Sequence, residues 1–213
     1  MSKYVTEMIG TFFLVLTIGL AVLSGTALAP LAIGVSLMAM IYMGGHISGA
    51  HYNPAVSLAI MLRGKLPISE FVPYVISQLV GSLTAAGMVW IIVGKTFAPE
   101  PASAVLWFQP LIVEILYTFA LALVVLNVAT SPATEGNPYY GLAIGFTIVA
   151  ATFVGGPVSG GAFNPAVGTG PTIIHALVGE GSWKHLWLYW VGPFAGGAIA
   201  AGVYRVQHSN SGE

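Results

Sequence analysis

The sequence contains no cysteine and no aspartate, and only 6% of its 213 residues are charged. The missing cysteine excludes disulfide bonds and thiol chemistry. A soluble domain carries about 25% charged residues, so this chain cannot cover its surface with charge. Because 56% of the residues are hydrophobic, we expect that surface to face lipid. The formal net charge is −1 with no basic face, so a nucleic-acid partner is not expected.

The motifs of common enzymes are also missing. There is no phosphate-binding glycine loop with lysine, no Gly-x-Ser-x-Gly and no pair of exposed carboxylates. His46 and His51 lie close together, but two histidines are too few for a metal site in a chain without cysteine. We expect them to pack in a loop against a backbone partner. No enzyme activity, metal or cofactor is therefore expected.

Long apolar segments fill most of the chain. A membrane-spanning helix needs about 20 apolar residues. Six segments approach that length, at about residues 3–24, 30–43, 70–93, 111–129, 139–154 and 185–205. Two further apolar pieces, 54–62 and 165–178, follow Gly-containing loops at 44–52 and 155–163 and are too short to span. The predicted fold is an all-α membrane protein with six transmembrane helices and two re-entrant half-helices.

The two halves of the chain repeat one another. Glu7 in the first half corresponds to Glu114 in the second half. Tyr74 corresponds in the same way to Tyr189, although the two pairs are separated by different numbers of residues. Three spans in each half invert the second half, which gives a 3+3 inverted repeat. We therefore expect one channel domain over residues 1–213, with repeat one at about 3–94, a linker at 95–110 and repeat two at about 111–206.

Two nine-residue stretches stand at equivalent places in these halves, Ser-Gly-Ala-His-Tyr-Asn-Pro-Ala-Val at 48–56 and Ser-Gly-Gly-Ala-Phe-Asn-Pro-Ala-Val at 159–167. Asn is a favoured N-cap and Pro a favoured first helical residue. If Asn53 and Asn164 each cap a helix with their oxygen, the amide NH2 groups stay free. Two such helix starts facing each other would aim two donors and two positive helix ends at one point.

These stretches resemble the paired signatures of the aquaporins, the major intrinsic protein channels, and the resemblance covers about residues 4–205. It implies a passive channel for water and small uncharged solutes, and a homotetramer with one pore in each subunit. The signature residues are Asn53, Pro54, Ala55, Asn164, Pro165 and Ala166, with the two asparagines as the donors at the centre of the pore.

Irregular backbone at membrane depth is tolerated where it lines a watery cavity or is buried in protein. We therefore expect the pore to be lined by the carbonyl groups of Gly49, Ala50, His51, Tyr52, Gly160, Gly161, Ala162 and Phe163. Glu7 and Glu114 lie inside spans, where ionisable groups are functional by default. The favoured interpretation, which the resemblance also implies, is that each braces the N–H groups of its own loop. A proton-coupled transporter would use them differently.

One position departs from the family pattern. In water-selective and glycerol-conducting relatives an arginine usually follows the second Asn-Pro-Ala, and here that residue is Val167. Counting from the signatures places the rest of the filter at Ile33, Thr152 and Gly161. Such a filter is wide, mostly apolar and uncharged. Resemblance to family members that lack this arginine implies small neutral solutes, namely glycerol, urea, ammonia, or neutral metalloid and arsenical species. The alternative is an ion- or proton-coupled secondary transporter of a small solute.

The basic residues predict the orientation. Lys3, Arg63, Lys65 and Arg205 fall on one side of the bilayer, and Lys95 and Lys184 on the other. The side with more basic residues is expected to be cytoplasmic. We therefore predict a multi-pass protein of the plasma or inner membrane with a retained first helix and both termini inside.

Overall fold

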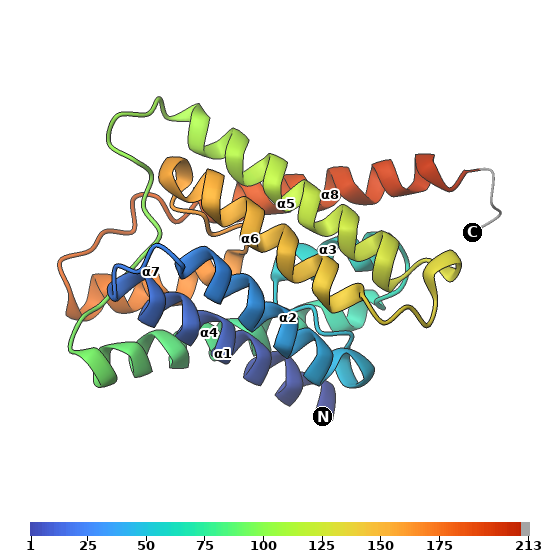
Figure 1. Ribbon diagram of the computed structural model, residues 1–213, viewed down its shortest axis with the longest axis horizontal. Coiled ribbons are helices and arrows are strands. Elements are labelled where there is room, and N and C mark those ends of the chain that lie inside the picture. Colours follow the sequence, from blue (N-terminus) through green and yellow to red (C-terminus); the bar gives the residue numbers. More distant parts are fainter. Residues whose placement is uncertain (210–213) are drawn as a thin grey trace.

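The computed structural model describes residues 1–209, and within them it contains helices and no strands (Figure 1). The six long helices are α1 (Ser2–Leu23), α2 (Ala29–Ser48), α4 (Ile68–Val93), α5 (Phe108–Ala129), α6 (Tyr140–Ser159) and α8 (Leu188–Gln207). The two short helices are α3 (Pro54–Leu62) and α7 (Pro165–Val178), and a 3-10 turn spans Pro132–Thr134. The last four residues of the chain lie outside the described part.

Five of the long helices, α1, α2, α4, α5 and α6, are long and apolar enough to cross a membrane. α8 contains 20 residues, as many as α2 and α6, but its two tyrosines, Arg205 and Gln207 make it less apolar. It lies along α5, as Figure 1 shows. The pattern of six long and two short helices predicted from the sequence is therefore present.

The packing repeats between the two halves of the chain. α1 packs against α4, and a Cβ on Gly81 of α4 would lie 2.3 Å from the carbonyl oxygen of Met8. α5 packs in the same way against α8, where a Cβ on Gly196 would lie 2.4 Å from the carbonyl oxygen of Ile115. The glycines let the backbones approach closely, which is the usual way in which helices associate in a membrane. The helices α2 and α6, which occupy equivalent places in the two halves, pack against each other.

Two helices continue further than the sequence indicated. The predicted loops 44–52 and 155–163 are wrong in extent, because α2 runs to Ser48 and α6 to Ser159. Gly44 and Gly155, which the sequence predicts in loops, are helical glycines that make room for the side chain of Tyr52 or Phe163. A Cβ on Gly44 would lie 1.9 Å from the hydroxyl of Tyr52, and one on Gly155 would lie 2.8 Å from the ring of Phe163.

The connection between the halves, residues 94–107, is packed onto the bundle. The ring of Phe97 is buried beside Gly19 of α1. The backbone of Glu100 lies against Gly160, and the N–H of Ala102 donates to the carbonyl of Val158 at 3.1 Å. We call this end of the bundle the linker face. The opposite end, where α1 begins and α8 ends, is the terminal face.

Candidate functional site

Each short helix begins with an asparagine cap. Asn53 has an extended backbone, and its Oδ1 accepts a hydrogen bond from the N–H of Ala55 at 2.9 Å. Asn164 does the same with the N–H of Ala166, also at 2.9 Å. Proline follows at the first helical position in both, where its missing N–H costs nothing. The local sequence is therefore sufficient to explain where α3 and α7 start.

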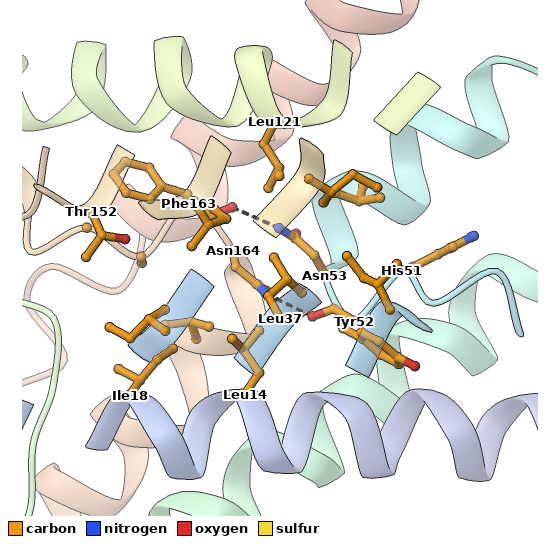
Figure 2. A pocket seen from close by; sticks show the side chains of 18 of the residues that line it. Leu14, Ile18, Leu37, His51, Tyr52, Asn53, Leu121, Thr152, Phe163 and Asn164 are labelled. Carbon is orange, nitrogen blue, oxygen red and sulfur yellow. Dashed lines mark hydrogen bonds between the residues drawn. The ribbon is translucent and has the colours of Figure 1, made fainter. Parts of the chain in front are cut away.

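The two asparagines also join the loops to each other. Asn53 Nδ2 donates to the carbonyl of Phe163, and Asn164 Nδ2 donates to the carbonyl of Tyr52, both at 2.9 Å (Figure 2). The prediction that both amide NH2 groups are free is therefore wrong for one N–H of each group. Among the described residues the second N–H has no partner, and it is available to the cavity that both asparagines line.

The loops between the helices have an unusual backbone. Tyr52 and Phe163, the residues before the two asparagines, have φ angles of 49° and 48°. Residues other than glycine rarely adopt this left-handed backbone conformation, and holding one residue in it costs about 1–3 kcal/mol. Contacts elsewhere must therefore hold each loop in place.

In the first loop those contacts come from Glu7 of α1. Its Oε1 accepts hydrogen bonds from the hydroxyl of Ser48 at 2.7 Å and the N–H of His51 at 2.9 Å. Its Oε2 accepts from the N–H of Tyr52 at 2.7 Å and from the amide of Gln78 at 2.9 Å. The carboxylate is fully buried and has four donors, of which two belong to the irregular segment and one to Ser48 at the end of α2.

Glu114 of α5 has the same place in the second half. Its Oε1 accepts from the hydroxyl of Ser159 at 2.8 Å and the N–H of Ala162 at 3.0 Å, and its Oε2 accepts from the N–H of Phe163 at 2.7 Å. No fourth donor is recorded for it among the described residues. By the offset that matches Tyr74 to Tyr189, the position of Gln78 is occupied in this half by Pro193, which carries no side-chain donor.

Two tyrosines provide a second attachment that sequence analysis missed. Tyr74 donates to the carbonyl of Ser48 at 2.8 Å, and Tyr189 donates to the carbonyl of Ser159 at 2.6 Å. These carbonyls end α2 and α6 and would otherwise lack a partner. Tyr74 and Tyr189 occupy equivalent positions in the sequence repeat, and this equivalence is the sequence feature from which their shared role could have been predicted.

A cavity of about 80 Å³ runs beside the paired asparagines. It is lined by all four residues predicted for the filter, Ile33, Thr152, Gly161 and Val167, together with Asn53 and Asn164. Its remaining wall is mostly aliphatic, from residues such as Leu14, Ile18, Leu37, Leu121, Val125, Ile144 and Ile148. None of its lining residues is Glu, Lys or Arg. Figure 2 shows the asparagines in the middle, with Thr152 toward one end and His51 toward the other.

Of the eight residues expected to present carbonyls, seven line this cavity. The eighth, Gly49, lines a wider mouth of about 950 Å³ at the terminal face. Ala50, His51, Ile41, Val125 and Ile144 line both spaces, so the mouth leads into the cavity. Glu7 and Glu114 line neither space.

The histidines differ from expectation. His46 belongs to α2 instead of a loop. The ring of His51 is bonded to a side chain and not to the backbone, because its Nδ1 lies 3.0 Å from the hydroxyl of Ser57. Residues 1–209 bring no three His or Glu side chains together as metal ligands.

Two capped half-helices that meet at the centre of an inverted helical repeat, beside an uncharged cavity, define a channel-type membrane protein. The particular family follows from comparison with known proteins. The family model for the major intrinsic protein matches residues 1–204, and the chain belongs to this family of aquaporin channels. It is an integral membrane channel and not an enzyme, as predicted.

Several relatives are similar over nearly all of the chain. "Aquaporin NIP1-1" of Zea mays is 34% identical over 96% of this chain and 74% of its own length. "Probable aquaporin NIP4-2" of Arabidopsis thaliana is 37% identical with the same coverage. "Aquaporin Z" of Rhodopseudomonas palustris is 34% identical over 96% of this chain and 92% of its own.

A solved structure supports the fold. The X-ray structure of the aquaglyceroporin from Plasmodium falciparum matches with a TM-score of 0.85 at 22% identity, over 95% of this chain and 94% of that one. At this identity the likeness concerns the fold alone. The aquaporin-like fold class predicted from the sequence is confirmed.

Proposed function

We propose that this chain conducts water and small uncharged solutes passively through a filter without arginine. The observation that carries the proposal is that Ile33, Thr152, Gly161 and Val167, from four separate segments, line one cavity with both central asparagines. The solutes that suit it are glycerol, urea, ammonia, and neutral metalloid or arsenical species.

The chemistry of the lining supports this selectivity. At the predicted filter the side-chain polar group is the hydroxyl of Thr152, and the other side chains are aliphatic or absent. Val167 lies in the first turn of α7 and is almost completely buried. Gly161 lies directly on Gly156, because a Cβ on Gly161 would be 3.0 Å from the Cα of Gly156. As a glycine, it projects no side chain from the loop at this point. Such a passage selects by size and by absence of charge.

Exclusion of ions then depends on the centre of the pore. The positive ends of α3 and α7 and the amides of Asn53 and Asn164 meet there, and half-helix dipoles of this kind are barriers to protons and cations. A water molecule beside the asparagines accepts hydrogen bonds from both N–H groups. Its oxygen then cannot accept a hydrogen bond from the next water, and this interrupts the chain of hydrogen bonds that could carry protons.

The buried carboxylates argue against a coupled transporter. Glu7 and Glu114 have every recorded hydrogen bond inside the protein, and neither reaches the cavity or its mouth. A group that exchanges protons with a transported solution needs contact with that solution. Both carboxylates are therefore assigned to bracing the loops.

The test is a solute panel in proteoliposomes. Wild-type protein is expected to pass water and at least one solute of glycerol size, with rates that do not change when a pH or sodium gradient is imposed. Val167→Arg is expected to lower the ratio of solute to water permeability, because the guanidinium narrows the opening and adds a positive charge. Stopped-flow light scattering gives both permeabilities on the same vesicles. Passage of water alone by the wild type, or an unchanged ratio in Val167→Arg, would show that the filter is misplaced.

We further propose that the terminal face is cytoplasmic, that the protein belongs to the plasma or inner membrane, and that it forms a homotetramer. The charge distribution supports the orientation. Lys3, Arg63, Lys65 and Arg205 lie at or near the terminal face, and Lys95 and Lys184 lie at the linker face. Protease accessibility of tags at the two termini tests the orientation, and mass measurement of the protein in detergent tests the homotetramer.

A further inference from the structure

Two linked hydrogen bonds fasten the start of α7 to the long helix α8. The indole Nε1 of Trp190, on α8, donates to Thr169 Oγ1 at 2.9 Å. Thr169 Oγ1 in turn donates to the carbonyl of Pro165 at 2.6 Å. An indole N–H can only donate and a carbonyl oxygen can only accept, so the direction of both bonds is fixed. The proline that ends this series belongs to the second Asn-Pro-Ala.

The first half of the chain cannot form this connection. By the offsets that match the two asparagines and the two tyrosines, Thr169 corresponds to Leu58 and Trp190 to Val75. Leucine and valine carry no polar side-chain atom, so α3 is not joined to α4 in the same way. The predicted filter residue Val167 belongs to α7. The connection is therefore present only on the short helix that contributes to the filter.

Thr169 and Val167 face nearly opposite sides of α7. Successive residues of an α-helix are turned by about 100°, so two residues on the chain is about 200° around the helix. Val167 lines the cavity, whereas Thr169 and Trp190 line neither the cavity nor the mouth. The bond between Trp190 and Thr169 therefore holds α7 from the side that faces away from the pore.

The position of Val167 depends on the backbone of α7, because a valine side chain has no polar atom with which to fix itself. Neighbours confine that backbone on two sides. On α8, the Cβ of Tyr189 would lie 2.4 Å from a Cβ on Gly168. On α4, Ser82 donates to the carbonyl of Ala166 at 2.6 Å. The first turn of α7 is thus placed between two long helices, and its attachments to them determine its distance from the pore.

We infer that Trp190 and Thr169 are positioning residues of the filter: the bond between them holds α7 back against α8 and sets how far Val167 reaches into the opening. The ring of Trp190 is itself held edge to face by Phe194, with ring centroids 5.4 Å apart. This inference rests on the proposed function, because it states how a filter without arginine keeps its width. Larger neutral solutes such as glycerol depend on that width more steeply than water does.

The bond itself is tested first, because it does not depend on transport. Protein labelled with ¹⁵N-tryptophan is studied in proteoliposomes by solid-state NMR, and Trp190→Phe identifies the indole signal of Trp190 among those of the five tryptophans. Thr169→Val should move this signal to its non-bonded position, and Thr169→Ser should keep it. Thr147→Val, which removes a hydroxyl bonded to the carbonyl of Ala143 within α6, should leave the signal unchanged. A signal that does not respond to Thr169→Val overturns the proposal.

Flux in the same vesicles is the second test, with water, urea and glycerol as probes. Trp190→Phe keeps a ring beside Phe194 but has no N–H. It should lower the ratio of glycerol to water permeability by about two- to tenfold, the range that one neutral hydrogen bond supports. A merely structural role would reduce the amount of working protein, which lowers both permeabilities equally and leaves the ratio unchanged. The double variant with Thr169→Val should lower the ratio no further than Thr169→Val alone, because both changes remove the same bond.

The control for the flux test is Trp187→Phe, which changes an exposed indole at the start of α8 and should leave the ratio as in the wild type. An unchanged ratio in Trp190→Phe would show that the bond forms without positioning the filter, and this overturns the inference while the proposed function stands. A wild type that passes water alone refutes the proposed function. The inference is then decided by the water permeability of Trp190→Phe per folded molecule, and an unchanged value overturns it.

Discussion

The two re-entrant loops share one backbone and differ in their supports. Both have a buried glutamate, a serine at the helix end, a tyrosine on that serine's carbonyl and an asparagine that reaches across to the other loop. The first glutamate has four donors and the second has three. The shared set therefore accompanies the same loop backbone in both halves, whereas the fourth donor, Gln78, supports the first loop alone among the described residues.

The largest effect is expected when the glutamates are removed. Glu7→Leu leaves four buried donors without an acceptor, and Glu114→Leu leaves three. Each unsatisfied donor costs about 1–3 kcal/mol of stability, so both variants should be strongly destabilised, and Glu7→Leu more than Glu114→Leu. Glu→Gln keeps the shape and an acceptor and should lose less stability, with conduction preserved. Thermal unfolding in detergent, followed by size-exclusion chromatography, gives the order.

A Glu7→Leu variant as stable as the wild type would contradict the bracing role. Well-folded Gln variants that no longer transport, or whose transport loses a dependence on pH, would favour a coupled transporter.

The asparagines should instead behave alike, because their cross-loop bonds are equal. Asn53→Asp and Asn164→Asp each replace an N–H donor with a carboxylate oxygen beside a carbonyl oxygen, at the 2.9 Å now spanned by a hydrogen bond. Burying that charge without a donor costs several kcal/mol unless the group takes up a proton. Expression, assembly or flux should fall in both. Unchanged flux in both well-expressed variants would refute the paired donors, and a loss in one alone would break the symmetry.

The glycines under the loop aromatics allow a sharper comparison. Gly44→Ala meets the Tyr52 hydroxyl, which is itself held by the carbonyl of Met40 at 2.9 Å, whereas Gly155→Ala meets the edge of the Phe163 ring, which has no such bond. Overpacking of this kind costs about 1–3 kcal/mol, and we expect Gly44→Ala to be the worse of the two. Melting temperatures of the two variants against wild type measure the difference, and the reverse order would show that the ring of Phe163 is the more rigid.

The smallest effect concerns a contact that only one half has. Ser82 donates to the carbonyl of Ala166 at 2.6 Å, and at the equivalent place Gly197 leaves no room for a side chain beside the carbonyl of Ala55. Ser82→Ala loses one hydrogen bond, about 1 kcal/mol, and should lower the melting temperature by about 2–4 °C. Ser77→Ala, on the same helix, is the control. Equal shifts in the two variants would remove any special role for this contact.

Much of this architecture was readable from the chain alone. Long apolar segments, Asn-Pro starts for α3 and α7 and the repeated Glu7 and Glu114 are local signals, since each depends on neighbours in sequence or on composition. They were sufficient for the helix inventory, the inverted repeat and the family. Counting from Asn53 and Asn164 also found four residues that line one cavity with them, Ile33, Thr152, Gly161 and Val167.

The remaining features depended on tertiary contacts. Gly44 and Gly155 continue their helices because an aromatic side chain from the next segment fills the space above them, and glycine by itself gives no sign of that. The bonds from Asn53 to Phe163 and from Asn164 to Tyr52 join residues far apart in the chain. The contacts of Gln78 with Glu7 and Ser57 likewise form only when α3 and α4 are packed on α1. The sequence by itself determined which segments are helical and how they repeat, and the tertiary structure decided which polar groups meet in the pore, because hydrogen bonds between distant segments exist only after the helices have packed.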